Sequence, residues 1–151
     1  MEEEKEQVRM VEITRKTDLT RIAKASGHIR LRPETVKRIK KGDIEKGNVL
    51  AVAKTAAILA AKQTPIIVPL CHPIPITKVS IDTKIVDDGV TVTSEVVSVG
   101  KTGVEMEALT SLSAALLTIW DMVKKYEKDD LGQYPNTAIT NIHVIKKEKR
   151  K

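Results

Sequence analysis

Two segments of alternating residues around an Asp-Asp-Gly turn restrict this chain to folds that contain an antiparallel hairpin. Apolar and polar side chains alternate through ITKVSIDTKIV (76–86) and again through VTVTSEVVSV (90–99). A period of two places one face of each strand against a core, and the turn at Asp87, Asp88 and Gly89 joins neighbouring strands. The chain must therefore bury one face of a sheet.

Helix signals lie on both sides of this hairpin. Residues 33–42 begin with a proline and end with a glycine, which is typical of a short helix. A second helix is expected from Asn48, a plausible N-cap, to the stop at Pro65. Leucine, isoleucine and valine recur at three- and four-residue steps through 103–130, which predicts a long third helix. The apolar face of the second helix is expected at Val49, Val52, Ala53, Ala56, Leu59 and Ala60.

A short strand at 27–32 and a closing strand at 137–147 complete the pattern. Strands joined by a hairpin, with helices between the others, predict an α+β fold in which one antiparallel sheet carries helices on one face. The length of 151 residues suits one domain. We expect a frayed or disordered N-terminus at 1–10, a single domain at 11–146 and a basic tail at 147–151.

The net charge of +6 raises the possibility of a nucleic-acid partner, but its distribution argues against one. Residues 49–140 contain eight Lys or Arg against ten Asp or Glu, so the basic excess lies in the N-terminal third and in the tail. No Phe, one Trp and two Tyr leave little surface on which bases stack. We therefore expect no nucleic-acid partner.

Cysteine usage and hydropathy predict a soluble, cytoplasmic protein without a membrane partner. A single cysteine excludes an internal disulfide, and no N-terminal apolar run resembles a signal peptide. Lysine, threonine or proline interrupts each apolar stretch before it reaches the length of a membrane span. The richness in Lys, Glu, Ile and Val is typical of thermophilic proteins.

The segment PLCHPIPIT (69–77) predicts a rigid extended loop, because three prolines remove backbone donors and fix φ. No second cysteine and no metal-binding spacing accompany Cys71 and His72, so we expect no metal site. Cys71 is expected to be a small buried apolar group, since a thiol needs a base to activate it and the side chain of the next residue, His72, is expected to point elsewhere. His72 is the better candidate for binding or proton transfer.

The long helix has a face of small residues with charges at both ends. Glu107 and Asp121 lie fourteen positions apart on this face, which is about 21 Å along a helix. Either Glu107 precedes the helix, or complete sites form between subunits. Asp121 and Lys124 share one face, as an ordinary surface ion pair also would. The loop GKTG (100–103) lacks a Walker A pattern and is a weak phosphate signal.

Three blocks together are more specific than any one of them. The segments KGNVLAVAKTAAILAAKQT (46–64), PLCHPIPIT (69–77) and GKTGVEMEALTSLSAALLTIWDMVKK (100–125) resemble, in matching order, the signature blocks of the molybdenum-cofactor biosynthesis protein C family, the cyclic pyranopterin monophosphate synthases. The resemblance extends from about Val11 to Lys128. It implies a ferredoxin-like fold and a hexamer, assembled as a trimer of dimers with sites at a dimer interface.

The resemblance also implies a reaction and a set of residues. The family converts a cyclised dihydro-GTP into cyclic pyranopterin monophosphate and releases pyrophosphate, a lyase reaction of molybdopterin biosynthesis. It implies no cofactor, although a divalent ion can accompany pyrophosphate. The implied catalytic residues are Asp121, Lys124 and Lys46, and the implied substrate-binding residues are Leu70, Cys71, His72, Glu105, Met106 and Glu107.

The chain departs from the family pattern at two places. Asn48 stands where the family commonly has Asp, which preserves a helix cap. The stretch LGQYPNTAIT (131–140) is longer than expected, and KKEKRK (146–151) replaces a segment containing glycine and serine. A further family lysine falls near Lys147 in a loose alignment.

Two other functions compete with this interpretation. A small basic RNA- or ribosome-associated domain agrees with the pI of about 9.4 and predicts binding that weakens steeply with salt. A non-catalytic, oligomeric nucleotide-binding protein would need Lys46 and the loop 100–103, but it would not need Asp121.

Overall fold

A computed structural model describes residues 7–151. The expected frayed N-terminus lies partly outside these residues, and residues 7–13 have no regular secondary structure. The elements follow the order β1 (Leu19–Arg30), α1 (Pro33–Lys41), α2 (Val49–Lys62), α3 (Thr64–Ile67), β2 (Ile76–Val86), β3 (Gly89–Gly100), α4 (Glu105–Glu127) and β4 (Ala138–Arg150).

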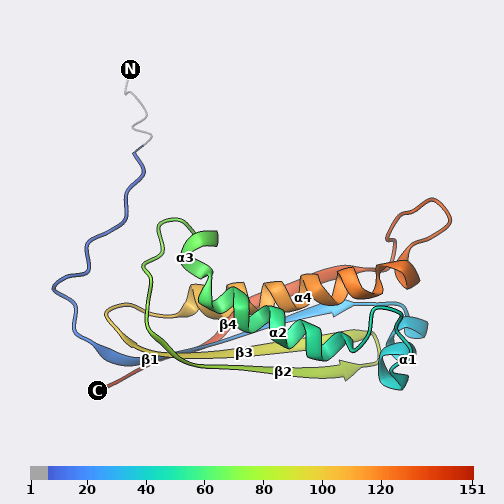
Figure 1. Cartoon of the computed structure of the whole chain (residues 1–151), viewed down its shortest axis with the longest axis horizontal. Coiled ribbons are helices and arrows are strands. Elements are labelled where there is room, and N and C mark those ends of the chain that lie inside the picture. The colour runs from blue at the N-terminus through green and yellow to red at the C-terminus, as the bar shows by residue number, and fades with distance from the viewer. Residues whose placement is uncertain (1–6) are drawn as a thin grey trace.

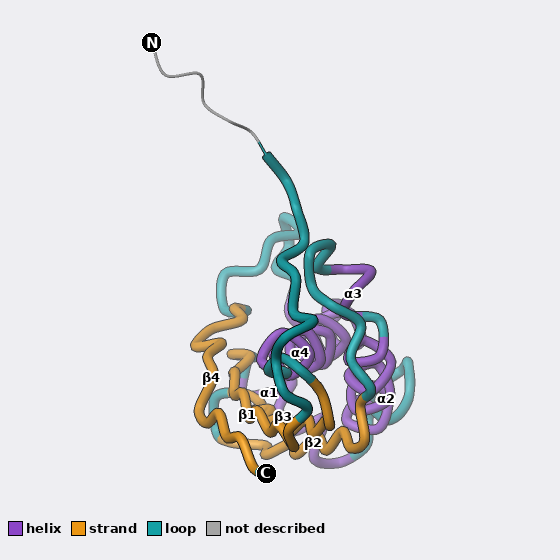
Figure 2. Tube along the Cα trace, turned by 90° about the vertical axis from the view of Figure 1, so that its left-hand side faces the viewer, coloured by secondary structure: helices purple, strands orange, loops and turns teal. Residues whose placement is uncertain are grey.

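The four strands form one antiparallel sheet in the order β2-β3-β1-β4, with α2 and α4 on one of its faces (Figure 1). This is the ferredoxin-like arrangement, so the predicted α+β fold is confirmed. Viewed from the end of the molecule, the helices lie on one side of the curved sheet (Figure 2). The β4 edge extends beyond the helices, beside α4.

The predicted hairpin is formed by β2 and β3, with Val86 opposite Gly89. Gly89 has φ of 155°, and a Cβ atom there would overlap the carbonyl oxygen of Ile29 on β1. The turn therefore requires glycine at this position, because only glycine lets the two backbones approach so closely.

Strand β1 begins eight residues before the predicted strand at 27–32. Its inward positions are Arg21, Ala23, Ala25, Gly27 and Ile29, and all are buried. A Cβ atom on Gly27 would lie 2.6 Å from Leu112 Cδ1 of α4. Small inward residues thus let α4 pack directly on the centre of the sheet.

Helix α2 begins at the predicted cap, where the Asn48 side chain accepts a hydrogen bond from Ala51 N at 3.1 Å. Its buried face differs from the expected one. Val49, Ala53 and Ala60 are buried as predicted, but the side chains of Val52 and Leu59 are 44% and 54% exposed. Alanines form the seam with α4, which allows the two helix backbones to lie close together.

A buried carboxylate joins three elements at the end of α4. Glu127 is 1% exposed, and its carboxylate accepts hydrogen bonds from the backbone N–H of Arg32 and from the hydroxyl groups of Thr35 and Thr137. Arg32 is the N-cap of α1 and has no capping bond from its own side chain. Glu127 therefore caps α1 from a distant helix, where the helix dipole favours a negative charge.

Helix α4 is long and apolar enough to span a membrane by length and composition alone. Half of its most apolar stretch is buried, and Leu112, Leu116 and Ile119 are fully covered by the sheet and α2. Packing in the core accounts for this apolar character.

The predicted closing strand continues to Arg150, so the segment 147–150, expected as a tail, belongs to β4. Two register shifts interrupt its pairing with β1, and Asn141 has a positive φ of 61° beside one of them. Such bulges make the exposed edge of β4 irregular, which disfavours pairing with a strand of another molecule.

Candidate functional site

The first group of predicted residues meets at the C-terminal end of α4. Lys46 Nζ lies 3.2 Å from Asp121 Oδ2, and Lys124 Nζ lies 3.0 Å from Asp121 Oδ1. Lys46 Nζ also donates to the backbone oxygen of Asp121 at 3.1 Å. One carboxylate thus holds two ammonium groups from segments far apart in sequence. We call these three residues the Asp121 cluster.

The loop between α1 and α2 brings Lys46 to α4 through contacts on both sides of it. Glu45 N donates to the hydroxyl oxygen of Tyr126 at 2.9 Å, and the Glu45 carboxylate pairs with Lys125. The Arg38 guanidinium lies 4.6 Å from the centre of the Tyr126 ring, which adds a cation–π contact. Tyr126 therefore fixes the loop one residue before Lys46.

The three charges of the Asp121 cluster stabilise one another. Hydrogen bonds from Lys124 and then Lys46 hold the pKa of Asp121 below its ordinary value, and Asp121 raises the pKa of Lys124. All three side chains are about half exposed, so solvent screens these effects. At neutral pH, Asp121 is therefore ionised and Lys124 protonated.

The second group lies at the other end of α4, beside the proline-rich loop. Cys71 Sγ lies 3.7 Å from Glu107 Oε2 and donates a weak hydrogen bond to it. Glu107 is 1% exposed, and its Oε1 has no hydrogen-bond partner among the residues that the structure describes. Burial raises the pKa of Glu107. Glu107 Oε1 is therefore a buried oxygen at the edge of the apolar core that could accept a further hydrogen bond.

Glu105 begins α4, and its carboxylate folds over Gly103, where a side chain would overlap it. Burial works to raise the pKa of Glu105, but a hydrogen bond from Lys147 of β4, 2.7 Å away, a backbone hydrogen bond and the charges of Lys147 and Arg21 together lower it below its ordinary value. The N-terminus of α4 therefore already has a carboxylate of its own. We call Cys71, Glu105, Glu107 and Lys147 the Glu107 cluster.

Three other predicted residues surround this cluster. His72 Nε2 lies 2.6 Å from the carbonyl oxygen of Val11, so the proline-rich loop contacts the N-terminal segment. Leu70 and Met106 are 43% and 40% exposed. The expected burial of Cys71 is incomplete, because its side chain is only half-buried.

The structure does not bring the two clusters together. Glu107 lies inside α4, so the alternative in which it precedes the helix is wrong. Fourteen residues of continuous helix keep Glu107 and Asp121 about 21 Å apart within one chain. A single small substrate cannot touch both of these residues on one chain.

Cys71 offers a direct test of its predicted packing role. Burial, followed by the nearby charge of Glu107, raises the pKa of its thiol to about 11, so the thiolate is scarce at neutral pH. We expect Cys71→Ala to lower stability slightly and to leave turnover within about tenfold, because no nucleophile is lost. Steady-state kinetics and thermal unfolding measure the two effects. A covalent substrate adduct on Cys71 would contradict this expectation.

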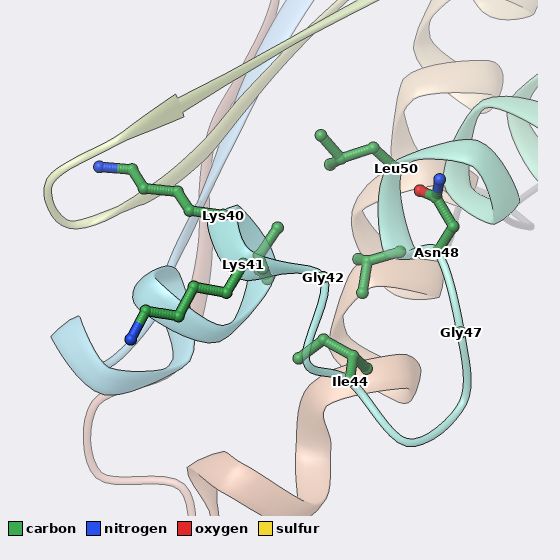
Figure 3. A pocket seen from close by; sticks show the side chains of 9 residues that line it. Lys40, Lys41, Gly42, Ile44, Gly47, Asn48 and Leu50 are labelled. Carbon is green, nitrogen blue, oxygen red and sulfur yellow. The ribbon is translucent and has the colours of Figure 1, made fainter.

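A hollow of about 470 Å³ lies between the end of α1 and the start of α2. None of the predicted site residues lines it. Figure 3 shows the Lys40 and Lys41 side chains extending away from Asn48, with their ammonium groups far from the start of α2. The geometry therefore gives no anion site at this hollow.

Several neighbours of the predicted residues were not anticipated. Buried Arg21 donates to the carbonyl oxygens of Gly100 and Thr17, and so fixes the loop before α4. The only feature of the sequence that could have indicated this role is that Arg21 occupies an inward position of β1. Tyr126 and Lys125 had no signal at all, since their partner Glu45 is distant in sequence. Within residues 7–151, no three His, Cys, Asp or Glu side chains lie close enough to hold a metal ion.

Comparison with known proteins shows that nearly the whole chain matches one protein family. Residues 10–150 match the model of the MoaC family. A Methanococcoides burtonii protein is 61% identical over 93% of this chain and 88% of its own length, and a Pyrococcus horikoshii protein is 60% identical over 94% and 89%. Both are named probable cyclic pyranopterin monophosphate synthase. A Methanothermobacter thermautotrophicus relative, 58% identical over 94% of this chain and 89% of its own length, is named a probable accessory protein of that synthase.

Proposed function

This chain belongs to the MoaC family, and we propose that it is a lyase that converts cyclised dihydro-GTP into cyclic pyranopterin monophosphate and pyrophosphate. The reaction is a step of molybdenum cofactor biosynthesis. The observation that supports this function best is the Asp121 cluster, in which an exposed carboxylate lies within 3.2 Å of two lysine ammonium groups. Exposed ion pairs contribute little unless several charges form a network, as Asp121 does with Lys124 and with Lys46 of a distant loop.

The chemistry of the reaction suits these groups. Opening a purine-derived ring and closing a pterin requires repeated proton transfers, which a carboxylate and an adjacent ammonium group supply. Closing the cyclic phosphate expels pyrophosphate as a polyanion, and Lys46 and Lys124 neutralise its developing charge. Asp121 accepts protons and Lys124 donates them.

We further propose that complete sites form between chains of a cytoplasmic hexamer, with sites at the dimer interface. The Asp121 cluster of one chain then faces the Glu107 cluster of another, with Leu70, His72 and Met106 beside the substrate. Exposed apolar side chains along α4 and the neighbouring edge strand support an interface there. Leu117 is 62% exposed, and Ile142, Val144 and Ile145 are 41%, 37% and 52% exposed.

Mixing two inactive variants tests the shared site. We expect Asp121→Asn and Glu107→Gln chains to be nearly inactive alone and to regain part of the activity after they are unfolded and refolded together, because some sites then contain no mutated residue. Activity of the mixture is compared with that of each variant treated alone. A fully active monomer in sedimentation would contradict the proposal.

The function itself is tested by incubating the protein with the cyclised dihydro-GTP and detecting both pterin and pyrophosphate. Formation of both products without any other protein supports the synthase assignment. Tight binding of the nucleotide without products would instead support a non-catalytic nucleotide-binding or accessory role. Binding of polynucleotides that weakens steeply with salt would support an RNA-associated domain.

A further inference from the structure

The loop between α1 and α2, residues 42–48, has different surroundings on its two sides. On one side, Lys46 pairs with Asp121 of α4. On the other side, the same loop lines the hollow of about 470 Å³ between the end of α1 and the start of α2. The lining includes three residues of this loop, Gly42, Ile44 and Gly47. Whatever fills the hollow therefore lies against the segment that carries Lys46.

The hollow is apolar inside and basic at its rim. Its apolar side chains are Ile39, Ile44, Val49 and Leu50. Lys40 and Lys41 complete the lining, and Figure 3 shows their ammonium groups directed outward. A compact anion does not suit this arrangement. An extended segment that places an apolar side chain in the hollow and carboxylates near the two lysines matches both its shape and its charge.

The N-terminal segment of this chain has that composition. Residues 1–6, MEEEKE, contain four glutamates against one lysine. Apolar residues follow, and Val8, Met10 and Val11 are 79%, 45% and 69% exposed. Apolar side chains at this density gain from being covered. The segment therefore complements the hollow in charge and in hydrophobicity.

This segment does not suit the hollow of its own chain. Residues 7–13 leave the molecule at the end opposite α1 and extend away from the sheet and helices (Figures 1 and 2). His72 holds the carbonyl oxygen of Val11 at 2.6 Å near the start of α4. The 23 residues of α4, about 34 Å, separate this point from the hollow. The ten residues before Val11 span at most about 33–36 Å and would have to run straight along the whole helix.

The hollow of a neighbouring chain is closer. In the proposed assembly, the Glu107 cluster of one chain faces the Asp121 cluster of another. His72 lies beside the first cluster, so Val11 emerges next to the neighbour's Lys46. The neighbour's hollow is then on the far side of one loop, within reach of ten residues. The argument takes from the proposed function only this pairing of chains.

We propose that residues 1–10 of one chain dock in the α1–α2 hollow of a neighbouring chain. An apolar side chain of the segment enters the hollow, and its glutamates lie near Lys40 and Lys41. Docking holds the loop of Lys46 from the side opposite Asp121. The occupant of the hollow is thus a second copy of this chain.

A synthetic peptide of residues 1–13 tests the docking, with a protein that lacks residues 2–9. We expect the peptide to bind this truncated protein in calorimetry, more weakly as salt rises. Full-length protein should bind it at least about tenfold more weakly, because its own segments occupy the hollows at a high effective concentration. Neither measurement involves substrate, so both are independent of catalysis.

Charge reversal identifies the site of binding. Combining Lys40→Glu with Lys41→Glu in the truncated protein should weaken peptide binding about fivefold to fiftyfold. A peptide that carries Glu2→Lys, Glu3→Lys and Glu4→Lys should bind this variant more tightly than the native peptide does. Such a reversal of preference requires direct pairing between the two sets of charges.

The matched control combines Lys54→Glu with Lys62→Glu. Both lysines are exposed on α2 outside the hollow, and the two substitutions change the net charge by the same amount. This variant should bind the peptide within about twofold of the truncated protein, because distant exposed charges are screened. Equal weakening by both double variants would show a general charge effect and overturn the inference.

Cross-linking of the intact protein shows which chain supplies the segment. Equal parts of ¹⁵N-labelled and unlabelled chains are unfolded and refolded together, and a carbodiimide then joins carboxylates to nearby ammonium groups. We expect links between the N-terminal segment and Lys40 or Lys41 that combine one labelled and one unlabelled peptide. Links within one label alone, or none to these lysines, overturn the inference.

The docking and the proposed function fail separately. Product formation by a protein whose truncated form binds no peptide overturns the docking and leaves the synthase assignment intact. Peptide binding and mixed-label links in a protein that forms no product overturn the assignment and leave the docking intact.

Discussion

Asp121→Asn lowers turnover at least about a hundredfold, while the protein stays folded and still binds the cyclised nucleotide. The amide keeps the shape of the side chain but cannot accept a proton from the substrate. General acid–base groups typically contribute about 10²–10⁴ in rate. Lys124→Ala should have an effect of the same size, because the donor of the pair is removed. Single-turnover formation of the pterin, with calorimetric binding of the substrate, measures chemistry and affinity separately.

The matched control for Asp121→Asn is Asp43→Asn. Asp43 also forms an exposed ion pair, with Arg38 at 2.9 Å, and it lies on the same side of the fold in the loop before Lys46. An exposed pair contributes at most about 1 kcal/mol to stability and nothing to chemistry, so this variant should keep near-normal turnover. Near-normal turnover in Asp121→Asn as well would falsify the catalytic assignment.

Glu127→Ala lowers the free energy of unfolding by roughly 3 kcal/mol. The substitution removes an acceptor shared by Arg32 N and two threonine hydroxyl groups, which then stay buried without partners. For a domain of this size, the melting temperature should fall by roughly 6–12 °C. Thermal unfolding is compared at one protein concentration, because assembly also affects stability.

Glu34→Ala is the control for this effect. Glu34 lies in the first turn of α1 and pairs with the Arg32 side chain at 3.3 Å, but its own side chain is 76% exposed. We expect a change within about 0.5 kcal/mol. Equal losses in the two variants would mean that Glu127 contributes no more than a surface charge.

Local patterns predicted the elements whose neighbours are close in sequence. The hairpin, the cap at Asn48 and the long helix are confirmed, because alternation, a capping side chain and a 3.6-residue period act over a few residues. The first half of β1 was missed because Arg21 points into the core. Its guanidinium is satisfied there by two backbone carbonyl oxygens that the sequence cannot place.

Long-range packing explains the remaining differences. The face of α2 that is buried is the one whose alanines pack against α4. Val52 and Leu59 lie outside this face and stay exposed despite their apolar character. β4 reaches Arg150 because β1 offers pairing partners beyond the two register shifts, as far as Thr20, and this part of the exposed edge strand consists of charged residues.

The site was predictable in part. The spacing of Asp121 and Lys124 indicated a shared face, and the structure gives a distance of 3.0 Å. Only the family resemblance indicated Lys46, whose position depends on the contact between Glu45 and Tyr126. The edge-on contact of Trp120 and Tyr134 spans a loop whose conformation no local pattern specifies.

Helix α4 fixes the angle around its axis between Glu107 and Asp121, in addition to the distance between them. Fourteen residues at about 100° each bring Glu107 and Asp121 to within about 40° of the same azimuth. One inserted or deleted residue between them would rotate one end by about 100° against the other and would leave every local contact at that end intact. The segment from Glu107 to Asp121 should therefore tolerate substitutions on its exposed side but not changes in length. Loop 128–137 carries no such phase, so residues added at its exposed tip near Leu131 would leave this angle unchanged.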